Sequence, residues 1–485
     1  MTSKSSTEKL LRWRRTKIIA TLGPATANKK SISQLIAAGV NVFRLNMSHG
    51  SHTSHTKAVG MIRAEATKQN KHIAILMDLC GPKIRVGEFI NGGIELKKSA
   101  SVTVTCRKVA GDVGLIPSQY RLLCKDVKAG DRILLDDGKM ELEVKQVKDK
   151  ELQCKVSYGG YLSNNKGMNL PDSSVSTDSF TRKDQEDARL AIKLDADFIA
   201  LSFVRRAQDV KKLNRFLEKN GRAIPVIAKI EKPEAVASID DILRESYGIM
   251  IARGDLGIEL PAQKVPLIQK QLINRARYFN CPVIVATQML ESMIENSRPT
   301  RAEVGDVANA ALSSTDAVML SAETATGQYP IKAVATMDSI LREIERYQLD
   351  AENAGTGIED YGGDPRMAIR RAVAHAVTLM ADEMELEGIV IPTSSGTTAR
   401  VLSSDRPAAP LMGVSTNSHV CRKLSIHWGV MPMLIPEKEA QNWSGLCQDI
   451  AARSLMKTRN SRVLLVSGFH DDPSQSEPVL KLVNL

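Results

Sequence analysis

Residues 197–230 read DFIALSFVRRAQDVKKLNRFLEKNGRAIPVIAKI, and this stretch decides the fold. An apolar run at residues 197–203 precedes a helix-like segment at residues 207–220, and a second apolar run follows at residues 225–230. Each run is aliphatic or β-branched and too short for a helix. Continuous apolar runs of this length are typical of strands that are buried on both faces of a parallel sheet. The stretch therefore predicts a strand–helix–strand unit.

The same unit recurs along the chain, outward in both directions from this stretch. Eight apolar runs of this kind occupy residues 17–22, 40–46, 73–78, 197–203, 225–230, 248–252, 282–287 and 316–321. Helix-like segments separate them, among them residues 29–38, 207–220, 265–279 and 301–312. Eight strand–helix units are what a (β/α)8 TIM barrel requires. We therefore expect an α/β protein with a (β/α)8 barrel at its centre.

One gap between successive runs, from residue 78 to residue 197, is much longer than the others. Polar and apolar residues alternate within it at residues 94–106, 131–147 and 151–158, and Asn91-Gly92 and Asp136-Asp137-Gly138 are turn signals. This pattern predicts an inserted small antiparallel β-barrel domain. Without residues 87–179, the chain up to residue 345 has the usual length of a barrel, about 250 residues.

A third region follows the barrel. Residues 350–364 are polar and glycine-rich and are predicted to form a linker, and further strand-like runs follow at residues 388–392, 410–415, 431–435 and 462–467. These runs predict a C-terminal open α/β domain. The expected domains are residues 1–86 with 180–345 (barrel), 87–179 (inserted β lid) and 352–485 (C-terminal α/β domain).

Composition excludes several classes of protein. The chain has 485 residues and a formal net charge of +11, and aromatic residues make up only 4% of it, which disfavours base stacking on nucleic acid. No apolar run reaches 18 residues, and residues 1–17 lack the apolar core of a secretory signal, so we expect no membrane span and a cytoplasmic location. The seven cysteines are scattered, with no two at the spacing of a metal site or a redox pair, which indicates reduced thiols. The positive charge suits small anionic substrates.

Polar residues gather where the predicted barrel strands end, at the face that carries TIM-barrel active sites. They are Thr21, Arg44, Asn46, Ser48, Asp78, Ser202, Lys229, Glu231, Arg253, Asp255, Thr287, Ser321 and Glu323. Capping and solvation would explain one or two such residues, but not three cations and four carboxylates on one rim.

The chemistry of this set points to phosphate. Glu231 and Asp255 are hard oxygen ligands suited to Mg²⁺ or Mn²⁺. Lys229 lies two residues before Glu231, so on a continuing strand both side chains point to one side. A cation tolerates a nearby divalent metal when a strongly anionic group lies between them, and Arg44 would grip such a group as a fork. The rim therefore predicts a phosphoryl-transfer site.

Several motifs also resemble the pyruvate kinase family, and the resemblance covers nearly all of the chain. They are KIIATLGP (17–24), RLNMSHG (44–50), GPKIR (81–85), KIE (229–231), ARGDLG (252–257), ATQMLESM (286–293) and SAETA (321–325). The resemblance implies transfer of a phosphoryl group from phosphoenolpyruvate to ADP in glycolysis, in a homotetramer. It also implies an inserted domain that closes over the site and excludes water.

The resemblance carries roles onto individual residues. Glu231 and Asp255 would bind the divalent metal, Lys229 would stabilise charge on the moving phosphoryl group and Arg44 would hold the phosphate. Backbone N–H groups around Gly254 and Asp255 would hold the substrate carboxylate beside Thr287, while Thr287 and Ser321 would belong to the proton relay. The residues implied on the nucleotide side are Asn46, His49, Arg85 and Lys166.

Two departures from the family pattern change the expectations. Most relatives have Thr and Glu where this chain has Leu79 and Lys83, and those relatives need K⁺. The remaining K⁺ ligands would be Asn46, Ser48 and Asp78, whereas Leu79 offers no side-chain oxygen and Lys83 places a fixed ammonium nearby. We therefore expect catalysis that does not require K⁺.

The second departure concerns regulation. In the family, a hydroxyl-rich loop of the C-terminal domain binds a regulatory sugar phosphate, which loop N–H groups and a helix N-terminus attract. The later loop at residues 467–472 is acidic and would repel a second phosphate, so we expect a sugar monophosphate or nucleotide effector, or none, over fructose 1,6-bisphosphate. The effector-loop residues are Thr393, Ser394, Ser395, Gly396, Thr397 and Thr398.

Two other functions stay open at this point. One is a different metal-dependent barrel enzyme acting on phosphoenolpyruvate or a keto acid, such as a lyase, and the lid and the nucleotide-side residues argue against it. The other is a catalytically silent protein that binds nucleic acid through its basic surface. The intact set of Lys229, Glu231, Asp255 and Thr287 argues against that alternative.

Overall fold

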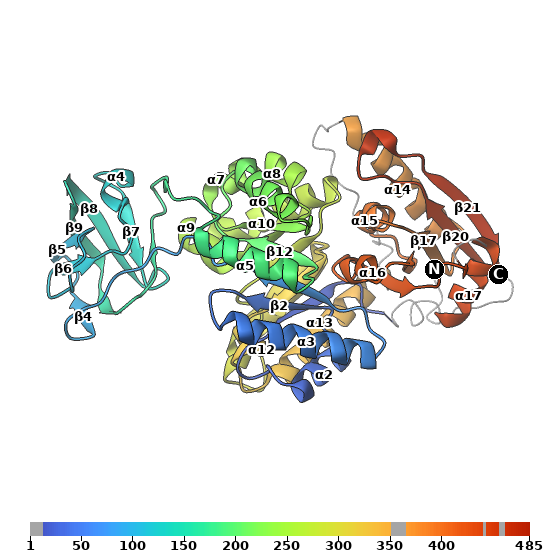
Figure 1. Ribbon diagram of the computed structural model, residues 1–485, viewed down its shortest axis with the longest axis horizontal. Helices are drawn as coiled ribbons and strands as arrows, with labels where there is room; N and C mark the ends of the chain where they lie inside the picture. The colour runs from blue at the N-terminus through green and yellow to red at the C-terminus, as the bar shows by residue number, and fades with distance from the viewer. Residues whose placement is uncertain (1–12, 351–364, 440–442, 455–460) are drawn as a thin grey trace.

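The computed structural model describes residues 13–350, 365–439, 443–454 and 461–485. Its described part contains a closed parallel barrel, an inserted β domain and a C-terminal α/β domain, which confirms the predicted fold class. The barrel lies between the two smaller domains, which extend from it in opposite directions (Figure 1). The predicted linker at residues 350–364 lies outside the described residues, except for Asp350 at the end of a helix.

All eight predicted runs form the strands of the barrel. Their order around it is β1-β16-β15-β14-β13-β12-β3-β2, with parallel pairing at the junctions. The strands are β1 (Lys17–Thr21), β2 (Val42–Asn46), β3 (Ala74–Asp78), β12 (Phe198–Leu201), β13 (Val226–Ile230), β14 (Gly248–Ala252), β15 (Val283–Ala286) and β16 (Ala317–Leu320).

Alternate residues of these strands are buried on opposite faces of the sheet. Ile227 and Met250 belong to the cluster inside the barrel, while Ile249 and Ile251 pack outward against the helices. Ile426 of the C-terminal domain joins the cluster inside the barrel and is fully buried there.

The helices that surround the barrel strands are α2 (Lys29–Ala37), α3 (His52–Lys68), α5 (Arg182–Lys193), α6 (Ala207–Lys219), α7 (Pro233–Ala237), α8 (Ile239–Glu245), α9 (Arg253–Glu259), η1 (Ala262–Lys264), α10 (Val265–Tyr278), η2 (Glu291–Ile294), α11 (Arg301–Leu312), α12 (Ala322–Ala325) and α13 (Pro330–Asp350).

Local sequence explains where several of these helices begin. Ser51, Thr181 and Thr300 each occupy the N-cap of a helix and form a capping box with the residue three positions later. The side chain of the cap and the side chain of that later residue satisfy each other's backbone N–H groups. This pairing fixes the first turns of α3, α5 and α11.

The inserted domain is a curled six-stranded sheet with an additional two-stranded pair, β10-β4. Its order is β11-β7-β8-β9-β5-β6, and the pairs are antiparallel except for β5 with β6, which is parallel. The antiparallel expectation therefore holds for most of the sheet but not for that edge. The elements are β4 (Gly93–Leu96), β5 (Ser101–Thr105), β6 (Leu115–Pro117), α4 (Leu123–Asp126), β7 (Arg132–Leu135), β8 (Met140–Lys148), β9 (Glu151–Tyr158), β10 (Gly160–Ser163) and β11 (Met168–Asn169).

The C-terminal domain is an open sheet of order β19-β18-β17-β20-β21. The four predicted strands run parallel, and β21 adds an antiparallel edge that the sequence reading had not included. The elements are α14 (Pro365–Glu383), β17 (Gly388–Pro392), α15 (Thr397–Ser404), β18 (Leu411–Ser415), α16 (Ser418–Leu424), β19 (Val430–Leu434), α17 (Trp443–Arg453), β20 (Arg462–Ser467), η4 (Pro473–Gln475) and β21 (Val479–Asn484).

Candidate active site

Charged side chains from neighbouring strands meet at the carboxyl end of the barrel. Arg44 on β2 donates through Nε to Asp78 Oδ2 at 2.7 Å, and its Nη2 lies 2.6 Å from the same oxygen. Asp78 ends β3 and is 1% exposed. Arg44 also donates to the hydroxyl of Thr21 on β1. The guanidinium is therefore held rigidly at the mouth of the barrel.

Lys229 on β13 is the centre of the cluster. Its Nζ lies 2.8 Å from Glu231 Oε1 and 3.5 Å from Asp78 Oδ1, and it donates to Ser202 Oγ at 2.8 Å. Burial alone would lower the pKa of Lys229, but Asp78 and Glu231 outweigh it and raise that pKa. In the same way, Lys229 and Arg44 overcome the burial of Asp78 and lower its pKa. The ammonium and the Asp78 carboxylate are both charged at neutral pH.

Asp255 and Glu231 form an acidic pair across β13 and α9. Glu231 is 2% exposed, and its Oε2 accepts a hydrogen bond from the Phe203 backbone N–H at 2.8 Å. Burial, and then the charge of Glu231, raise the pKa of Asp255 to about 6. Among the described residues, no donor is hydrogen-bonded to the Asp255 carboxylate. A divalent cation would relieve this repulsion, and two carboxylates leave room for the waters and substrate oxygens that Mg²⁺ retains. The donor set therefore fits Mg²⁺ or Mn²⁺.

Thr287 lies in a turn with unusual backbone geometry and is hydrogen-bonded to Gly254. Thr287 has φ +68° and the next residue, Gln288, has φ +53°, both in the left-handed region. Thr287 Oγ1 accepts from the Gly254 N–H at 2.8 Å and donates to the Ala286 carbonyl at 2.6 Å. Arg253 clamps the turn by donating to the Thr287 carbonyl. The Gly254 N–H is thus engaged by Thr287 rather than open toward a carboxylate.

Ser321 lies on the neighbouring strand end and begins α12. Its backbone N–H donates to Glu323 Oε2 at 2.6 Å. Glu323 also accepts from the Leu290 N–H, and burial raises the pKa of its carboxyl group. Within the described residues, Ser321 and Thr287 share no hydrogen bond. A proton relay between the two would need a bridging group.

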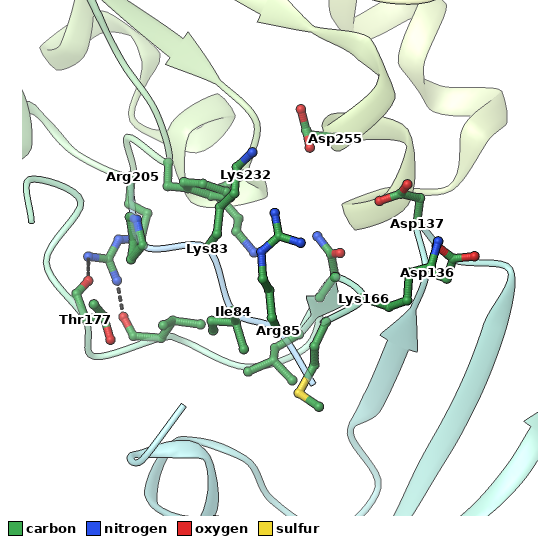
Figure 2. A pocket seen from close by; sticks show the side chains of 17 residues that line it. Lys83, Ile84, Arg85, Asp136, Asp137, Lys166, Thr177, Arg205, Lys232 and Asp255 are labelled. Carbon is green, nitrogen blue, oxygen red and sulfur yellow. Dashed lines mark hydrogen bonds and ion pairs between the residues drawn. The ribbon is translucent and has the colours of Figure 1, made fainter. Parts of the chain in front are cut away.

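A cavity of about 360 Å³ separates the barrel mouth from the inserted domain, and we call it the cleft. Figure 2 shows cationic side chains gathered in its middle, Asp255 on the barrel side and a pair of carboxylates on the tip of the β7–β8 hairpin. The charged lining residues are Lys83, Arg85, Asp136, Asp137, Lys166, Arg205, Lys232 and Asp255. The cleft thus gathers cationic side chains near Asp255.

The predicted nucleotide-side residues fall into two groups. Arg85 and Lys166 line the cleft; Arg85 donates to the Asn165 carbonyl at 2.7 Å, and Lys166 Nζ lies 2.9 Å from Asp136 Oδ1. His49 is exposed and lies outside the lining, and burial and then the charges of Lys83 and Arg85 lower its pKa. Asn46 is also outside the lining.

The side chain of Asn46 stabilises the loop that follows β2. Asn46 Oδ1 accepts from the Ser48 N–H at 3.1 Å. Leu79 is buried in the hydrophobic core with 1% exposure, so it offers nothing to a cation. Lys83, by contrast, is exposed and lines the cleft. Asp78 Oδ1 is a buried oxygen without a hydrogen bond in the described part of the chain.

Three residues that the sequence analysis did not single out, Glu259, Lys232 and Asn169, join the inserted domain to the barrel. Glu259 at the end of α9 accepts hydrogen bonds through one oxygen, Oε1, from Lys232 at 2.6 Å and from Asn169 of β11 at 3.0 Å. Lys232 lies two positions after the end of β13. A cation so close to the carboxyl end of a barrel strand was the sequence signal that could have identified it as a site residue. Glu259 ends the helix that carries Asp255, which links the lid to the acidic pair.

The hydroxyl-rich loop at residues 393–398 contacts the acidic loop at residues 467–472. Gly396, with φ +96°, precedes α15, and its N–H donates to Thr393 Oγ1 at 2.9 Å. Thr397 donates its hydroxyl to Asp471, and its Oγ1 lies 2.9 Å from Ser395 Oγ. Ser394 is exposed and Thr398 is buried. The carboxylate of Asp471 thus faces the hydroxyl groups that would meet a phosphate.

No helix in the described ranges is long and apolar enough to cross a membrane. Over the same ranges, no group of three or more His, Cys, Asp or Glu side chains is arranged to hold a metal ion.

Comparisons with known proteins agree with this geometry. The family model of the pyruvate kinase barrel domain matches residues 13–334, and that of the pyruvate kinase alpha/beta domain matches residues 371–481. Pyruvate kinase 2 of Synechocystis sp. is 45% identical over 426 residues, 87% of this chain and 71% of that protein. Pyruvate kinase of Geobacillus stearothermophilus is 41% identical over 473 residues, 97% of this chain and 80% of that protein.

A solved structure points the same way. The crystal structure of a pyruvate kinase from Cryptosporidium parvum matches with a TM-score of 0.90 and 33% identity, and covers 99% of this chain and 97% of that one. The chain belongs to the pyruvate kinase family of phosphotransferases.

Proposed function

We propose that this protein transfers the phosphoryl group of phosphoenolpyruvate to ADP, giving pyruvate and ATP in glycolysis. The observation that carries the proposal is the position of Lys229, whose ammonium contacts Glu231 and lies within the charge field of Asp78 and Asp255. A buried cation beside an acidic pair is suited to a phosphoryl group placed between them. Family membership and the cationic cleft support the same reaction.

Each residue of the mouth has a role in this proposal. Arg44 holds the phosphate of phosphoenolpyruvate, and its own position is fixed by Asp78. Lys229 neutralises charge that develops on the phosphoryl oxygens, while Arg85 and Lys166 bind the phosphates of ADP from the other side of the cleft. Because the Gly254 N–H is occupied by Thr287, the backbone N–H of Asp255 orients the substrate carboxylate beside Thr287. Thr287 and Ser321, joined through a bridging group, deliver the proton that pyruvate needs.

Glu231 and Asp255 would hold Mg²⁺ or Mn²⁺. Such a cation polarises phosphoryl and carboxylate oxygens when it is bound. The raised pKa of Asp255 and its lack of a donor among described residues support a site that is built for a positive ion.

The experiment is a coupled assay of pyruvate formation from phosphoenolpyruvate and ADP. We expect activity that depends on ADP and on Mg²⁺ or Mn²⁺. Pyruvate formation that does not depend on ADP would pass the phosphoryl group to water and would instead indicate the other kind of metal-dependent barrel enzyme. Steep salt-dependent binding to nucleic acid without kinase activity would indicate the silent binding protein.

Catalysis without K⁺ is a second part of the proposal. Leu79 is buried in the core, and the fixed ammonium of Lys83 lines the cleft and acts on the charge of Asp255. Replacement of K⁺ by a bulky organic cation should leave the rate nearly unchanged, and Lys83→Glu should create a K⁺ requirement. A large loss of wild-type rate without K⁺ would overturn this part.

Regulation is a third part. We expect an effector with one phosphate, either a sugar monophosphate or a nucleotide, at the loop from Thr393 to Thr398, because Asp471 opposes a second phosphate there. Titration of a sugar monophosphate and of fructose 1,6-bisphosphate at non-saturating phosphoenolpyruvate would separate the two. Asp471→Asn should improve the response to the bisphosphate.

Three further expectations complete the proposal: a homotetramer, a cytoplasmic location, and domain bounds at residues 1–86 with 180–345, 87–179 and 352–485. Sedimentation of the purified chain tests the first. Limited proteolysis, with cleavage expected near residues 87, 179 and 350, tests the third.

A further inference from the structure

Two of the seven cysteines meet in the inserted domain. Cys106 directly follows β5 and Cys124 lies on α4, and their Sγ atoms are 3.1 Å apart. Eighteen positions separate them in the chain, which is why their spacing gave no sign of a pair. Both thiols are free and partly exposed.

The geometry is close to that of a covalent link. A disulfide has an S–S bond of about 2.05 Å, so the sulfur atoms need to approach by only about 1 Å. Rotation about χ1 of the two cysteines moves their sulfur atoms by distances of this order.

The two thiols differ in their surroundings. Cys106 lines a surface hollow between β5 and the segment that follows β6, whereas Cys124 does not line it. This hollow lies at the surface, so a small oxidant has direct access to the Cys106 sulfur. Burial, followed by the hydrogen bond with Cys106, raises the pKa of Cys124 to about 12, so this thiol stays protonated at neutral pH. Cys106 is therefore the sulfur that an oxidant reaches first, and Cys124 is placed to resolve it.

We propose that Cys106 and Cys124 are a modification site that a hydroperoxide converts into a reversible disulfide. The Cys106 thiolate attacks the peroxide O–O bond and takes one oxygen, which gives a sulfenic acid, and the peroxide is reduced to an alcohol or to water. The Cys124 sulfur then forms the S–S bond, and the hydroxyl group leaves with the Cys124 proton as water. A dithiol reductant reverses the link by exchange and is itself oxidised to a cyclic disulfide.

The pair is connected to the wall of the cleft. Asp126, two residues after Cys124 on the same helix, accepts hydrogen bonds from the Ser176 N–H at 2.7 Å and from the Ser176 hydroxyl at 2.6 Å. The flanking carbonyls of Val175 and Thr177 accept from Arg205 of the barrel, and both residues line the cleft. A link between Cys106 and Cys124 would hold α4 and thereby restrict this wall.

The test uses the full chain treated with a small excess of hydrogen peroxide, blocked with an alkylating agent and digested with trypsin without reduction. Trypsin cuts after Lys98, Arg107, Arg121 and Lys125, so the proposal predicts a disulfide-linked pair of peptides, residues 99–107 with residues 122–125. Dithiothreitol should separate them. Cys154, buried in the same domain, lies in the separate peptide of residues 151–155, so a link to it would be recognised.

Matched variants complete the design. Cys154→Ser should keep the link, while Cys106→Ser and Cys124→Ser should abolish it. Hydrogen exchange at residues 174–179 should slow several-fold in the oxidised wild type, and not in Cys106→Ser treated in the same way. Peroxide that leaves residues 99–107 unlinked, or oxidises Cys106 to the sulfinic acid without a link, would overturn the site. A link that leaves hydrogen exchange at residues 174–179 unchanged would overturn its connection to the cleft.

Discussion

The two ends of the barrel both bury charged side chains, but the hydrogen-bond partners of those side chains differ between the two ends. At the amino end, Asp197 accepts from the Ile75 N–H and from Arg63 and Arg422, all within 2.8 Å. At the carboxyl end, and among the described residues, Asp78 Oδ1 accepts no hydrogen bond and has only the Lys229 ammonium at 3.5 Å beside it. The Asp255 carboxylate also has no donor among those residues.

Asp316 shows the same completeness at the amino end. Its two oxygens accept from the Val283 N–H, from Arg406 and from the Trp428 N–H, at 2.9–3.1 Å. Arg406 and Trp428 belong to the C-terminal domain, so these bonds hold that domain against the barrel. At the amino end, the carboxylates with all their hydrogen bonds formed hold two domains together. At the carboxyl end, the carboxylates that lack hydrogen-bond donors are suited to a ligand.

The largest expected effect breaks the carboxyl end. Lys229→Met removes the buried cation that faces the phosphoryl group. We expect about a 10³-fold loss of kcat, at the upper end of what removal of one well-placed transition-state donor costs. The measurement is the coupled assay with saturating Mg²⁺, with circular dichroism to establish that the fold persists.

Lys17→Met is the matched control at the other end. Lys17 is also a buried lysine on a barrel strand, but its Nζ donates to the Val430 carbonyl of the C-terminal domain at 2.8 Å. Activity per folded molecule should change little. Equal loss in both variants would contradict the division of roles between the two ends.

The second effect breaks the amino end. Asp197→Asn removes the buried carboxylate that Arg63 and Arg422 share, and leaves Arg422 only its exposed ion pair with Asp195. Loss of one partner of a buried ion pair costs about 3 kcal/mol or more of unfolding free energy. Urea unfolding followed by tryptophan fluorescence measures this loss. Burial opposes the ionised form of Asp197, but His419, Arg63 and Arg422 outweigh it and lower its pKa.

A carboxyl group with a lowered folded pKa stabilises the fold above its unfolded pKa of about 3.9 and loses that contribution as the pH falls. The gap between wild type and Asp197→Asn should therefore narrow below about pH 4. Asp195→Asn is the control, because Asp195 is 54% exposed in its ion pairs and should contribute less than about 1 kcal/mol. A comparable loss in the control would remove the argument from burial.

The third effect sharpens the comparison at the junction of lid and barrel. Glu259→Gln weakens the charge-assisted bonds from Lys232 and Asn169, and at about 1.5 kcal/mol this corresponds to roughly a tenfold rise in KM for ADP. The effect on kcat should be smaller, since Glu259 contacts no reacting atom. Asp241→Asn, in an exposed pair with Arg244, should leave KM unchanged. An unchanged KM in Glu259→Gln would show that this contact does not position the lid.

The smallest effect is a pH slope. Burial lowers the pKa of Lys17 to about 7. Between that value and the unfolded pKa of about 10.4, the unfolded chain binds more protons at this group, so stability should rise with pH by at most about 1.4 kcal/mol per unit. Urea midpoints of wild type and Lys17→Met at pH 7.5 and 9 measure it. Parallel slopes for both proteins would exclude Lys17 as the source.

The short continuous apolar runs alone predicted the barrel. A strand that is buried on both faces is apolar at every position, whereas a helix on the surface is apolar on one face only. The convergence of Lys229, Glu231 and Asp255 also followed, since parallel strands bring their carboxyl ends to one rim. The left-handed turn at Thr287, which occupies the Gly254 N–H, did not follow, because a threonine carries no signal for positive φ. The contact between Asn169 and Glu259 depends on how two domains meet, and no local pattern encodes that.

Ile426 has a consequence for the integrity of the enzyme. This isoleucine of the C-terminal domain is part of the hydrophobic cluster inside the barrel. The barrel core is therefore completed by a side chain from another domain. Deletion of the C-terminal domain would expose the apolar interior of the barrel to water. We therefore expect the barrel to lose stability when that domain is removed.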